Sequence, residues 1–247
     1  MPAEPHVRVL RANLERLRGR IEAARRRTPR AAGSVTLVAV TKAAPEGAIS
    51  LLPECGVTDV AENRVQWAER KRPLSPPGLR WHGIGHLQRN KARRATELFD
   101  VFHALDSTAL ADRLESVLSE NGRTWPVYVE VNAADDPAKG GVAAEAALGF
   151  LSSLAARPHR DVDGLMTMAR EDHVGEEARP AFRALREIRD EATLRGIGGA
   201  VPLGLSMGMS FDFEVAIEEG ATLVRIGRSL WEGLPADLLA ADATGSS

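Results

Sequence analysis

Residues 202–227 read PLGLSMGMSFDFEVAIEEGATLVRIG, and they carry the clearest signal of the fold class. Two short apolar runs, Pro202–Ser206 and Thr222–Ile226, are typical of buried strands, and the longer segment between them, Phe211–Glu219, has helical spacing. Glycine and serine residues occupy the turn where the first run ends. The stretch therefore predicts a unit of strand, helix and strand.

The same alternation extends outward from this unit as far as Gly33. The expected strands are Val35–Val40, Thr58–Ala61, Leu79–Ile84, Val101–Leu105, Pro126–Asn132, Val162–Thr167, Pro202–Ser206 and Thr222–Ile226. The expected helical segments are Pro45–Cys55, Glu62–Arg72, Leu87–Phe99, Thr108–Asn121, Ala143–Arg157, Gly175–Arg195 and Phe211–Glu219. A chain of 247 residues with eight such alternations predicts an α/β fold of one domain, a single (β/α)8 TIM barrel with parallel strands.

The N-terminal segment is strongly basic, because residues 1–30 hold nine Arg and three Glu, a net charge of +6 in a chain whose total is −2. An arm that binds nucleic acid is one interpretation. A helix that packs on the barrel is favoured, because the apolar residues recur at alternating spacings of three and four. These residues are Val7, Leu10, Leu14, Leu17, Ile21 and Ala24.

The domain layout follows from this pattern. We expect residues 1–33 to form the docked extra helix, 34–239 the barrel, and 240–247 a disordered tail. Only the short segment Ser229–Leu239 follows the last expected strand, so the N-terminal helix is expected to help close the outer ring of helices there.

The composition indicates a soluble cytoplasmic protein. No apolar run is long enough to span a bilayer, and the N-terminus lacks the apolar core of a secretory signal. The single cysteine, Cys55, cannot form an internal disulfide, and no cluster of Cys or His has the spacing of a zinc site. We therefore expect a monomer with no metal, no membrane association and no nucleic-acid partner.

Two polar residues follow the first two expected strands, at the end of the barrel where ligands of this fold bind. Lys42 follows the first strand directly, and its amine can form a Schiff base with an aldehyde; a solvated lysine is the alternative. Asn63 follows the second strand, where it could hydrogen-bond a ligand or cap the next helix. Both residues are candidates for a binding site.

The loops after the seventh and eighth expected strands suit an anion. Ser206, Gly208 and Ser210 place small residues and exposed backbone N–H groups at a strand-to-helix turn, a feature typical of phosphate sites. Gly227 lets the backbone after the eighth strand approach the same anion. A capped turn without a ligand is the alternative.

Arg225 lies inside the eighth expected strand, two residues before that glycine. Its side chain should point into the mouth of the barrel, where a permanent positive charge needs an acceptor. A protein carboxylate would serve, and so would a pyridine nitrogen. In the second case the pyridine stays largely unprotonated and is a weak electron sink, because arginine does not readily give up a proton.

Other polar residues rank lower as functional candidates. His82, His86 and His103 lie near the third and fourth expected strands, where hydrogen-bonded structural histidines are common; His82 could also line the pocket. Lys139 lies in a glycine-rich turn after the fifth strand and is expected at the surface or at the entrance to the site.

Six blocks of the sequence, in order, resemble the pyridoxal phosphate homeostasis proteins of the YggS/PROSC type. The blocks are VAVTKAAP, AENRVQ, WHGIGHLQRNK, VNAADDPAKGG, GLMTMA and LSMGMSFDFEVAIEEGATLVRIGRSLWEG. The resemblance extends over residues 35–233 and implies a fold similar to the N-terminal barrel of alanine racemase. It implies pyridoxal 5′-phosphate bound covalently to Lys42, and a cofactor site at Lys42, Asn63, Ser206, Met207, Gly208, Arg225, Gly227 and Arg228.

The resemblance also assigns roles within that site. It implies that Ser206 and the backbone around Gly227 and Arg228 hold the phosphate, and that Arg225 faces the pyridine nitrogen. Family members lack the second domain that in alanine racemase supplies a tyrosine acid/base, and this chain has one tyrosine, Tyr128. The resemblance therefore implies a protein of intracellular cofactor homeostasis that holds the cofactor without substantial turnover, with apo-enzymes as candidate partners.

Three other functions stay open at this point. The first is a small pyridoxal-phosphate-dependent amino-acid racemase or lyase with Lys42 as its base. The others are a barrel for another phosphorylated metabolite and a nucleic-acid binder that uses the arginine-rich N-terminus. Two departures from the family pattern bear on the site: Gly83 replaces a bulky apolar residue, which would loosen the wall near the third strand, and Arg228 replaces a small hydroxyl residue.

Overall fold

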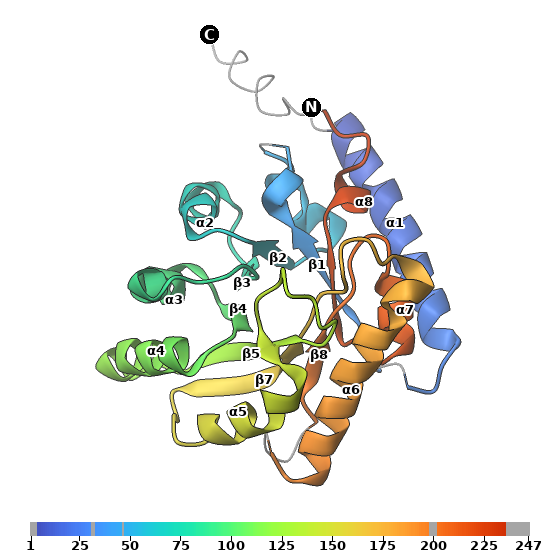
Figure 1. Cartoon of the computed structure of the whole chain (residues 1–247). Helices are drawn as coiled ribbons and strands as arrows, with labels where there is room; N and C mark the ends of the chain where they lie inside the picture. Colours follow the sequence, from blue (N-terminus) through green and yellow to red (C-terminus); the bar gives the residue numbers. More distant parts are fainter. Residues whose placement is uncertain (1–3, 31–32, 46, 198–201, 236–247) are drawn as a thin grey trace.

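The computed structural model describes residues 4–30, 33–45, 47–197 and 202–235. In this part of the chain, eight parallel strands close into a barrel surrounded by helices (Figure 1). Neighbours follow the order β1, β2, β3, β4, β5, β7, β8, β9, and β9 pairs back onto β1. The strands are β1 Thr36–Val40, β2 Asp59–Glu62, β3 Arg80–Gly83, β4 Val101–Leu105, β5 Trp125–Asn132, β7 Arg160–Met166, β8 Gly204–Ser206 and β9 Leu223–Ile226. The predicted TIM-barrel fold is confirmed.

Each expected strand occurs within two residues of its predicted bounds, because the short apolar runs are the buried walls of the barrel. All five residues of β4 are buried, for example. The structure adds one strand that was not predicted, β6 at Val142–Ala143, which pairs with β5 outside the barrel. Two residues are too few to show an alternating pattern.

Helices occupy most of the segments where helical period was seen. They are α1 Glu4–Arg26, α2 Val65–Lys71, α3 Ala92–Leu98, α4 Thr108–Asn121, α5 Ala147–Leu154, α6 Arg179–Leu194, α7 Phe213–Glu218 and α8 Arg228–Trp231. The helix expected over Pro45–Cys55 is wrong, since the described residues there form two 3-10 turns, Ala48–Leu51 and Pro53–Cys55. Pro53 cannot donate a backbone hydrogen bond, so it starts a new turn. None of the described helices is long and apolar enough to cross a membrane.

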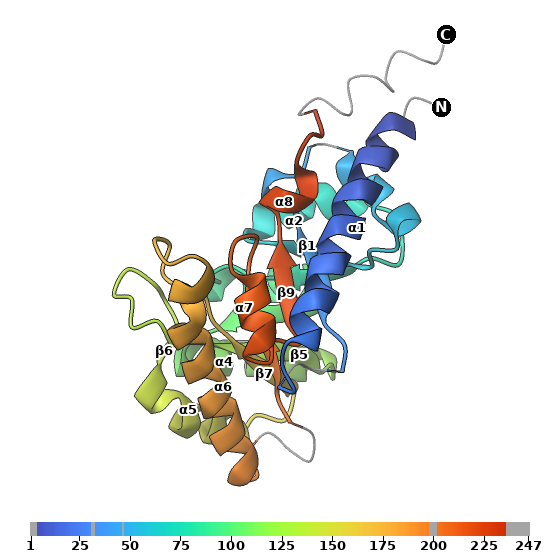
Figure 2. The same cartoon turned by 90° about the vertical axis from the view of Figure 1, so that its right-hand side faces the viewer.

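The N-terminal helix α1 lies beside α7 and α8 (Figure 2). All six residues of its predicted apolar stripe are buried. Asn13 donates to the carbonyl oxygen of Leu230 at 3.0 Å, and Arg20 pairs with Glu214 of α7. The helix therefore covers the barrel where the four-residue α8 leaves the wall uncovered. The predicted tail, 240–247, and the end of Ser229–Leu239 lie outside the described residues.

The wall near β3 is filled, which corrects the expectation drawn from Gly83. A β-carbon placed on Gly83 would lie 2.8 Å from a ring carbon of Phe99 and 3.2 Å from one of Phe102. The Phe99 ring thus occupies the volume that a larger residue at position 83 would take. With glycine at position 83 of β3, the ring of Phe99 fills the space, and no gap is left in the wall.

Candidate functional site

Two lysines lie near the C-terminal ends of β1 and β2, and they differ in their surroundings. Lys71 on α2 donates to the buried carboxylate of Glu62 at 2.7 Å and to the carbonyl oxygen of Thr41 at 2.6 Å. Lys42 lies in the 3-10 turn that follows β1, with an exposed side chain. No hydrogen bond or ion pair joins its amine to another described residue. The amine of Lys42 is therefore the one open to a ligand.

Glu62 fixes the backbone beside Lys42, a role that no pattern in the sequence indicates. Its carboxylate accepts hydrogen bonds from the Thr41 hydroxyl at 2.9 Å and from the Asn63 backbone N–H at 2.9 Å. These contacts tie the end of β1 to the end of β2. A buried carboxylate that interacts with both strand ends makes their spacing rigid.

Asn63 is exposed at the end of β2 and lines a cleft of about 490 Å³ with Trp67 and His86. It does not cap the next helix, because α2 starts after Arg64 and has no side-chain cap. A β-carbon on Gly85 would lie 2.1 Å from the carbonyl oxygen of Asn63. Only glycine at position 85 therefore lets the loop after β3 lie this close to the loop after β2. The side chain of Asn63 stays available to a ligand.

The loops after β8 and β9 come together in the structure. Ser210 accepts a hydrogen bond from the backbone N–H of Ser229 at 3.4 Å. Gly208 has φ of +95°, and a β-carbon there would lie 2.7 Å from the Ala216 side chain. This turn therefore requires glycine. Ser210 and Ser229 were not among the expected site residues, although Ser210 was noted as a small residue of the turn.

The loop after β9 also meets the end of β1. A β-carbon on Gly227 would lie 3.4 Å from the side chain of Val40, and the Trp231 indole donates to the Val40 carbonyl oxygen at 2.7 Å. The guanidinium of Arg228 lies 5.1 Å from the ring centre of Phe211 in the loop after β8. The structure thus brings the first and last loops of the barrel to the same place.

Arg225 is buried inside the barrel wall, and two of its five N–H donors are bonded to described residues. It donates to the Ser206 hydroxyl at 2.7 Å and to the Thr167 carbonyl oxygen at 3.0 Å. A protein carboxylate was one of the two acceptors expected for Arg225, but no carboxylate in the described part of the chain forms a salt bridge with it. Burial lowers the pKa of Arg225 to about 10, which leaves the guanidinium charged at neutral pH.

Ser206 and Met207, both expected in the site, are buried. The Ser206 hydroxyl has two protein partners, Arg225 and the Nδ1 atom of His103 at 2.9 Å. The predicted contact between Ser206 and a phosphate stays a prediction. Ser210, four residues later and beyond the strand, lies where the two anion loops meet.

Glu130 adds a titratable group to the same end of the barrel. Burial, with a smaller effect from the charge of Asp106, raises the pKa of its carboxyl group to about 7. Arg225 and Lys139 act in the opposite direction from nearby. Lys139 itself donates to the carbonyl oxygen of Ala169, so it links the loops after β5 and β7.

Comparison with known proteins agrees with this architecture. A model of the alanine racemase N-terminal domain family matches residues 12–235, and the chain belongs to that family. Within it, the chain is 39% identical over 219 residues to the pyridoxal phosphate homeostasis protein of Aquifex aeolicus, across 88% of this chain and 95% of the relative. The chain is therefore a member of the pyridoxal phosphate homeostasis protein family, as the sequence blocks indicated.

Two solved structures are also similar. PipY of Synechococcus elongatus PCC7942, with PLP bound, has a TM-score of 0.77 and 32% identity, and the match covers 90% of this chain and 99% of PipY. Alanine racemase of Clostridium difficile 630 has a TM-score of 0.68 and 17% identity over 94% of this chain and 58% of the racemase. The second match shows a shared fold, with further sequence in the racemase that this chain does not match.

Proposed function

We propose that this chain binds pyridoxal 5′-phosphate and holds it through a Schiff base on Lys42. The observation that carries the proposal is the contrast between two neighbouring amines, since Lys71 is bonded to Glu62 and Thr41 while Lys42 is open. The cofactor would supply an aldehyde carbon, which forms a C=N bond with the Lys42 nitrogen as water leaves. PipY, a relative of 32% identity, has the same cofactor bound.

The phosphate would be held where the loops after β8 and β9 meet. Gly208 and Gly227 let the two backbones approach an anion, and the Ser210 hydroxyl can donate to it. Arg228 replaces the small hydroxyl residue of the family and adds a positive charge beside these donors. We assign the hydroxyl contact to Ser210 because the Ser206 hydroxyl already has two partners inside the barrel.

Arg225 fits the ring of the cofactor, since three of its N–H donors have no hydrogen bond to a described residue. A pyridine nitrogen that accepts from a guanidinium stays largely unprotonated, and the ring then withdraws electrons weakly. Asn63 follows β2, two strands away from the strand of Arg225, and could donate to a ring oxygen. Such a site retains a cofactor well and promotes amino-acid chemistry poorly.

The function that follows is cofactor homeostasis in the cytoplasm rather than turnover. In this proposal the protein is a monomeric barrel, covered by its N-terminal helix, that keeps a reactive aldehyde masked and passes it to apo-enzymes. The names of the curated relatives support this role.

A small racemase or lyase with Lys42 as its base is the alternative, and a turnover assay separates the two. The cofactor-loaded protein at micromolar concentration would be incubated with a panel of L- and D-amino acids. The proposal predicts no racemisation, decarboxylation or elimination above about one turnover per hour. Turnover within the ordinary enzyme range of roughly 1–1,000 per second would establish the enzyme instead.

A further inference from the structure

A chain of four hydrogen bonds crosses the interior of the barrel and ends at the proposed cofactor-binding arginine. Asp59 Oδ1 lies 2.9 Å from His82 Nε2, and His82 Nδ1 lies 2.8 Å from His103 Nε2. His103 Nδ1 lies 2.9 Å from the Ser206 hydroxyl, which accepts from Arg225 Nη1 at 2.7 Å. Each distance is that of a well-formed hydrogen bond.

The two ends of the chain determine the direction of every bond in it. Arg225 can only donate and an ionised Asp59 can only accept. With both imidazoles neutral, a single arrangement then satisfies all contacts. Ser206 donates to His103 Nδ1, His103 Nε2–H donates to His82 Nδ1, and His82 Nε2–H donates to Asp59. All the protons therefore point from the arginine toward the carboxylate.

The surroundings favour these protonation states. Burial, with a smaller effect from the charge of Arg225, holds the pKa of His103 well below its ordinary value, so this ring is neutral. Burial alone would raise the pKa of Asp59, but hydrogen bonds from His82 and Thr58 outweigh it and hold the pKa lower. The Tyr128 ring stacks on His103 with centroids 4.4 Å apart and fixes the plane of the imidazole.

The chain runs along the barrel from one end to the other. Asp59 is the first residue of β2, His82 and His103 lie within β3 and β4, and Ser206 is the last residue of β8. The two histidines and Ser206 are at most 1% exposed. The Asp59 side chain is 14% exposed, so this carboxylate is the one member that reaches solvent at the end opposite the cofactor.

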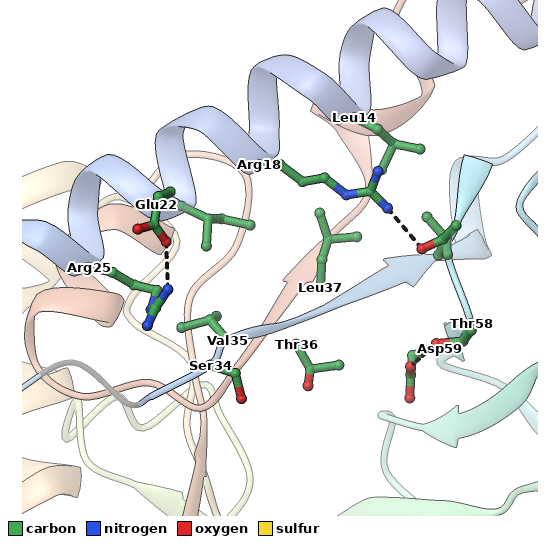
Figure 3. A pocket seen from close by; sticks show the side chains of 13 residues that line it. Leu14, Arg18, Glu22, Arg25, Ser34, Val35, Thr36, Leu37, Thr58 and Asp59 are labelled. Atoms are coloured by element: carbon green, nitrogen blue, oxygen red, sulfur yellow. Dashed lines mark hydrogen bonds and ion pairs between the residues drawn. The ribbon is translucent and has the colours of Figure 1, made fainter.

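A cavity of about 460 Å³ lies at that opposite end, and Asp59 lines it. Figure 3 shows α1 across one side, with Arg18, Glu22 and Arg25, and the start of β2 on the other, with Thr58 and Asp59. The cavity is bounded by the starts of β1 and β2, so it is separate from the site at the strand ends. It exposes the carboxylate end of the chain.

We propose that Asp59, His82 and His103 are positioning residues for the cofactor, because their hydrogen bonds hold Ser206 and Arg225 in one orientation against its ring. The inference rests on the proposed cofactor site. Its consequence is that a change of charge in the cavity beneath α1 alters how the cofactor is held at the other end of the barrel. The chain also provides a distant negative charge that offsets the buried guanidinium.

The first test measures the wild-type protein without its cofactor. Nitrogen-15 NMR of labelled histidine reports which ring nitrogen carries the proton, and a His103→Gln variant assigns the signals. The proposal predicts that His82 and His103 are both neutral at pH 7, with protons on Nε2 only and slow exchange with water. A proton on Nδ1 of either ring at pH 7 would overturn it.

The second test compares two substitutions at the same end of the barrel, made in the cofactor-loaded protein. Asp59→Asn keeps the shape and an acceptor oxygen but removes the charge. Asp163→Asn is the control, because Asp163 on β7 is also influenced by Arg80 yet has no hydrogen bond to a member of the chain in the described structure. The readouts are the visible absorption band of the bound cofactor and the rate of its release.

We expect Asp59→Asn to shift the absorption band and to speed release about tenfold, a ratio that corresponds to roughly 1.4 kcal/mol. Asp163→Asn should match the wild type in both readouts. If the wild type holds the cofactor and Asp59→Asn behaves like it, the positioning role is wrong. If the wild type does not hold the cofactor, the proposed function fails, and the NMR result alone decides whether the chain of bonds exists.

Discussion

Near β1 and near β8 the chain has a pair of like side chains. In each pair one amine or hydroxyl is bonded to two groups of the protein, and the other is bonded to fewer described groups. Near β1, Lys71 is bonded to Glu62 while the Lys42 amine has no partner among the described residues. Near β8, Ser206 is bonded inside the barrel while Ser210 faces the next loop. Lys71 and Ser206 hold the structure of the site together. Lys42 and Ser210 are the residues that can still bond to a ligand.

The two regions differ in how they would hold that ligand. The β1 side offers one covalent bond on a backbone that a buried carboxylate makes rigid. The β8 side offers several weak donors on two loops that are joined by the hydrogen bond from the Ser229 backbone to Ser210. Loss of Lys42 should therefore abolish covalent binding of the cofactor, whereas loss of Ser210 should weaken its binding only mildly.

The largest effect is expected from Lys42→Ala. This variant should lose the visible absorption of the covalently bound cofactor completely. Its free energy of unfolding should change by less than about 0.5 kcal/mol, because an exposed side chain contributes little packing. Absorption spectra and denaturant titration measure the two quantities. A variant that keeps the absorption band would contradict the assignment of Lys42.

Lys71→Met tests the other lysine of the same pair. We expect it to keep the covalent cofactor but to lose about 2–4 kcal/mol of stability, because the carboxylate of Glu62 is left buried without its cation. Urea titration measures the loss. The double variant Lys71→Met with Glu62→Gln should recover most of it. If Lys71→Met were as stable as the wild type, Glu62 would not fix the end of β1 in the way proposed.

Glu130→Gln tests how strongly burial at the mouth of the barrel, between the two regions, disfavours a charged carboxylate. Its folded-state pKa of about 7 lies above the ordinary value of 4.5, so the folded protein binds this proton more tightly than the unfolded chain does. The contribution of this group to stability is present below about pH 4.5 and is lost as pH rises to about 7. Glu130→Gln should remove this loss and raise stability at pH 8 by about 1–3 kcal/mol. Unchanged pH profiles of the melting temperature would refute the shift.

The smallest effect is expected from Ser210→Ala. Loss of one hydroxyl contact to a charged phosphate should weaken cofactor retention by about 1 kcal/mol, or roughly fivefold in release rate, since the backbone donors remain. The stability of the cofactor-free protein should change by less than about 0.5 kcal/mol, because the hydrogen bond lost to the Ser229 backbone is long, at 3.4 Å. Ser206→Ala, in contrast, should lower that stability, because Arg225 and His103 both lose a partner. If Ser206→Ala weakened cofactor retention and Ser210→Ala did not, the phosphate contact would belong to Ser206.

Local patterns were sufficient to predict most of the fold from the sequence. The eight strands of the barrel are short apolar runs, and the buried stripe of α1 is visible in its spacing. The helical period over Pro45–Cys55 does not reveal the break there, which follows from the missing backbone N–H of Pro53. Gly83 was misjudged because the volume it lacks is supplied by Phe99, sixteen residues later and on another element.

Less of the site could be predicted, because it depends on where each strand ends and how the strands are aligned. Ser206 and Ser210 lie in one motif. Since β8 ends at Ser206, that hydroxyl lies inside the barrel, while Ser210 lies in the following loop. Glu62 and Lys71 meet because α2 starts at Val65 and brings the lysine back over Thr41. The hydrogen bonds from Asp59 to Arg225 depend on the register of several strands, which no local pattern contains.

The central claim is that the Lys42 amine holds the cofactor, and mass spectrometry of the reduced protein tests it most directly. The protein would be loaded with pyridoxal 5′-phosphate, treated with borohydride to fix any C=N bond, digested and sequenced by fragmentation. The account predicts a single modified residue, Lys42. Modification of Lys71, Lys91 or Lys139 in its place, or of no lysine at all, would contradict it.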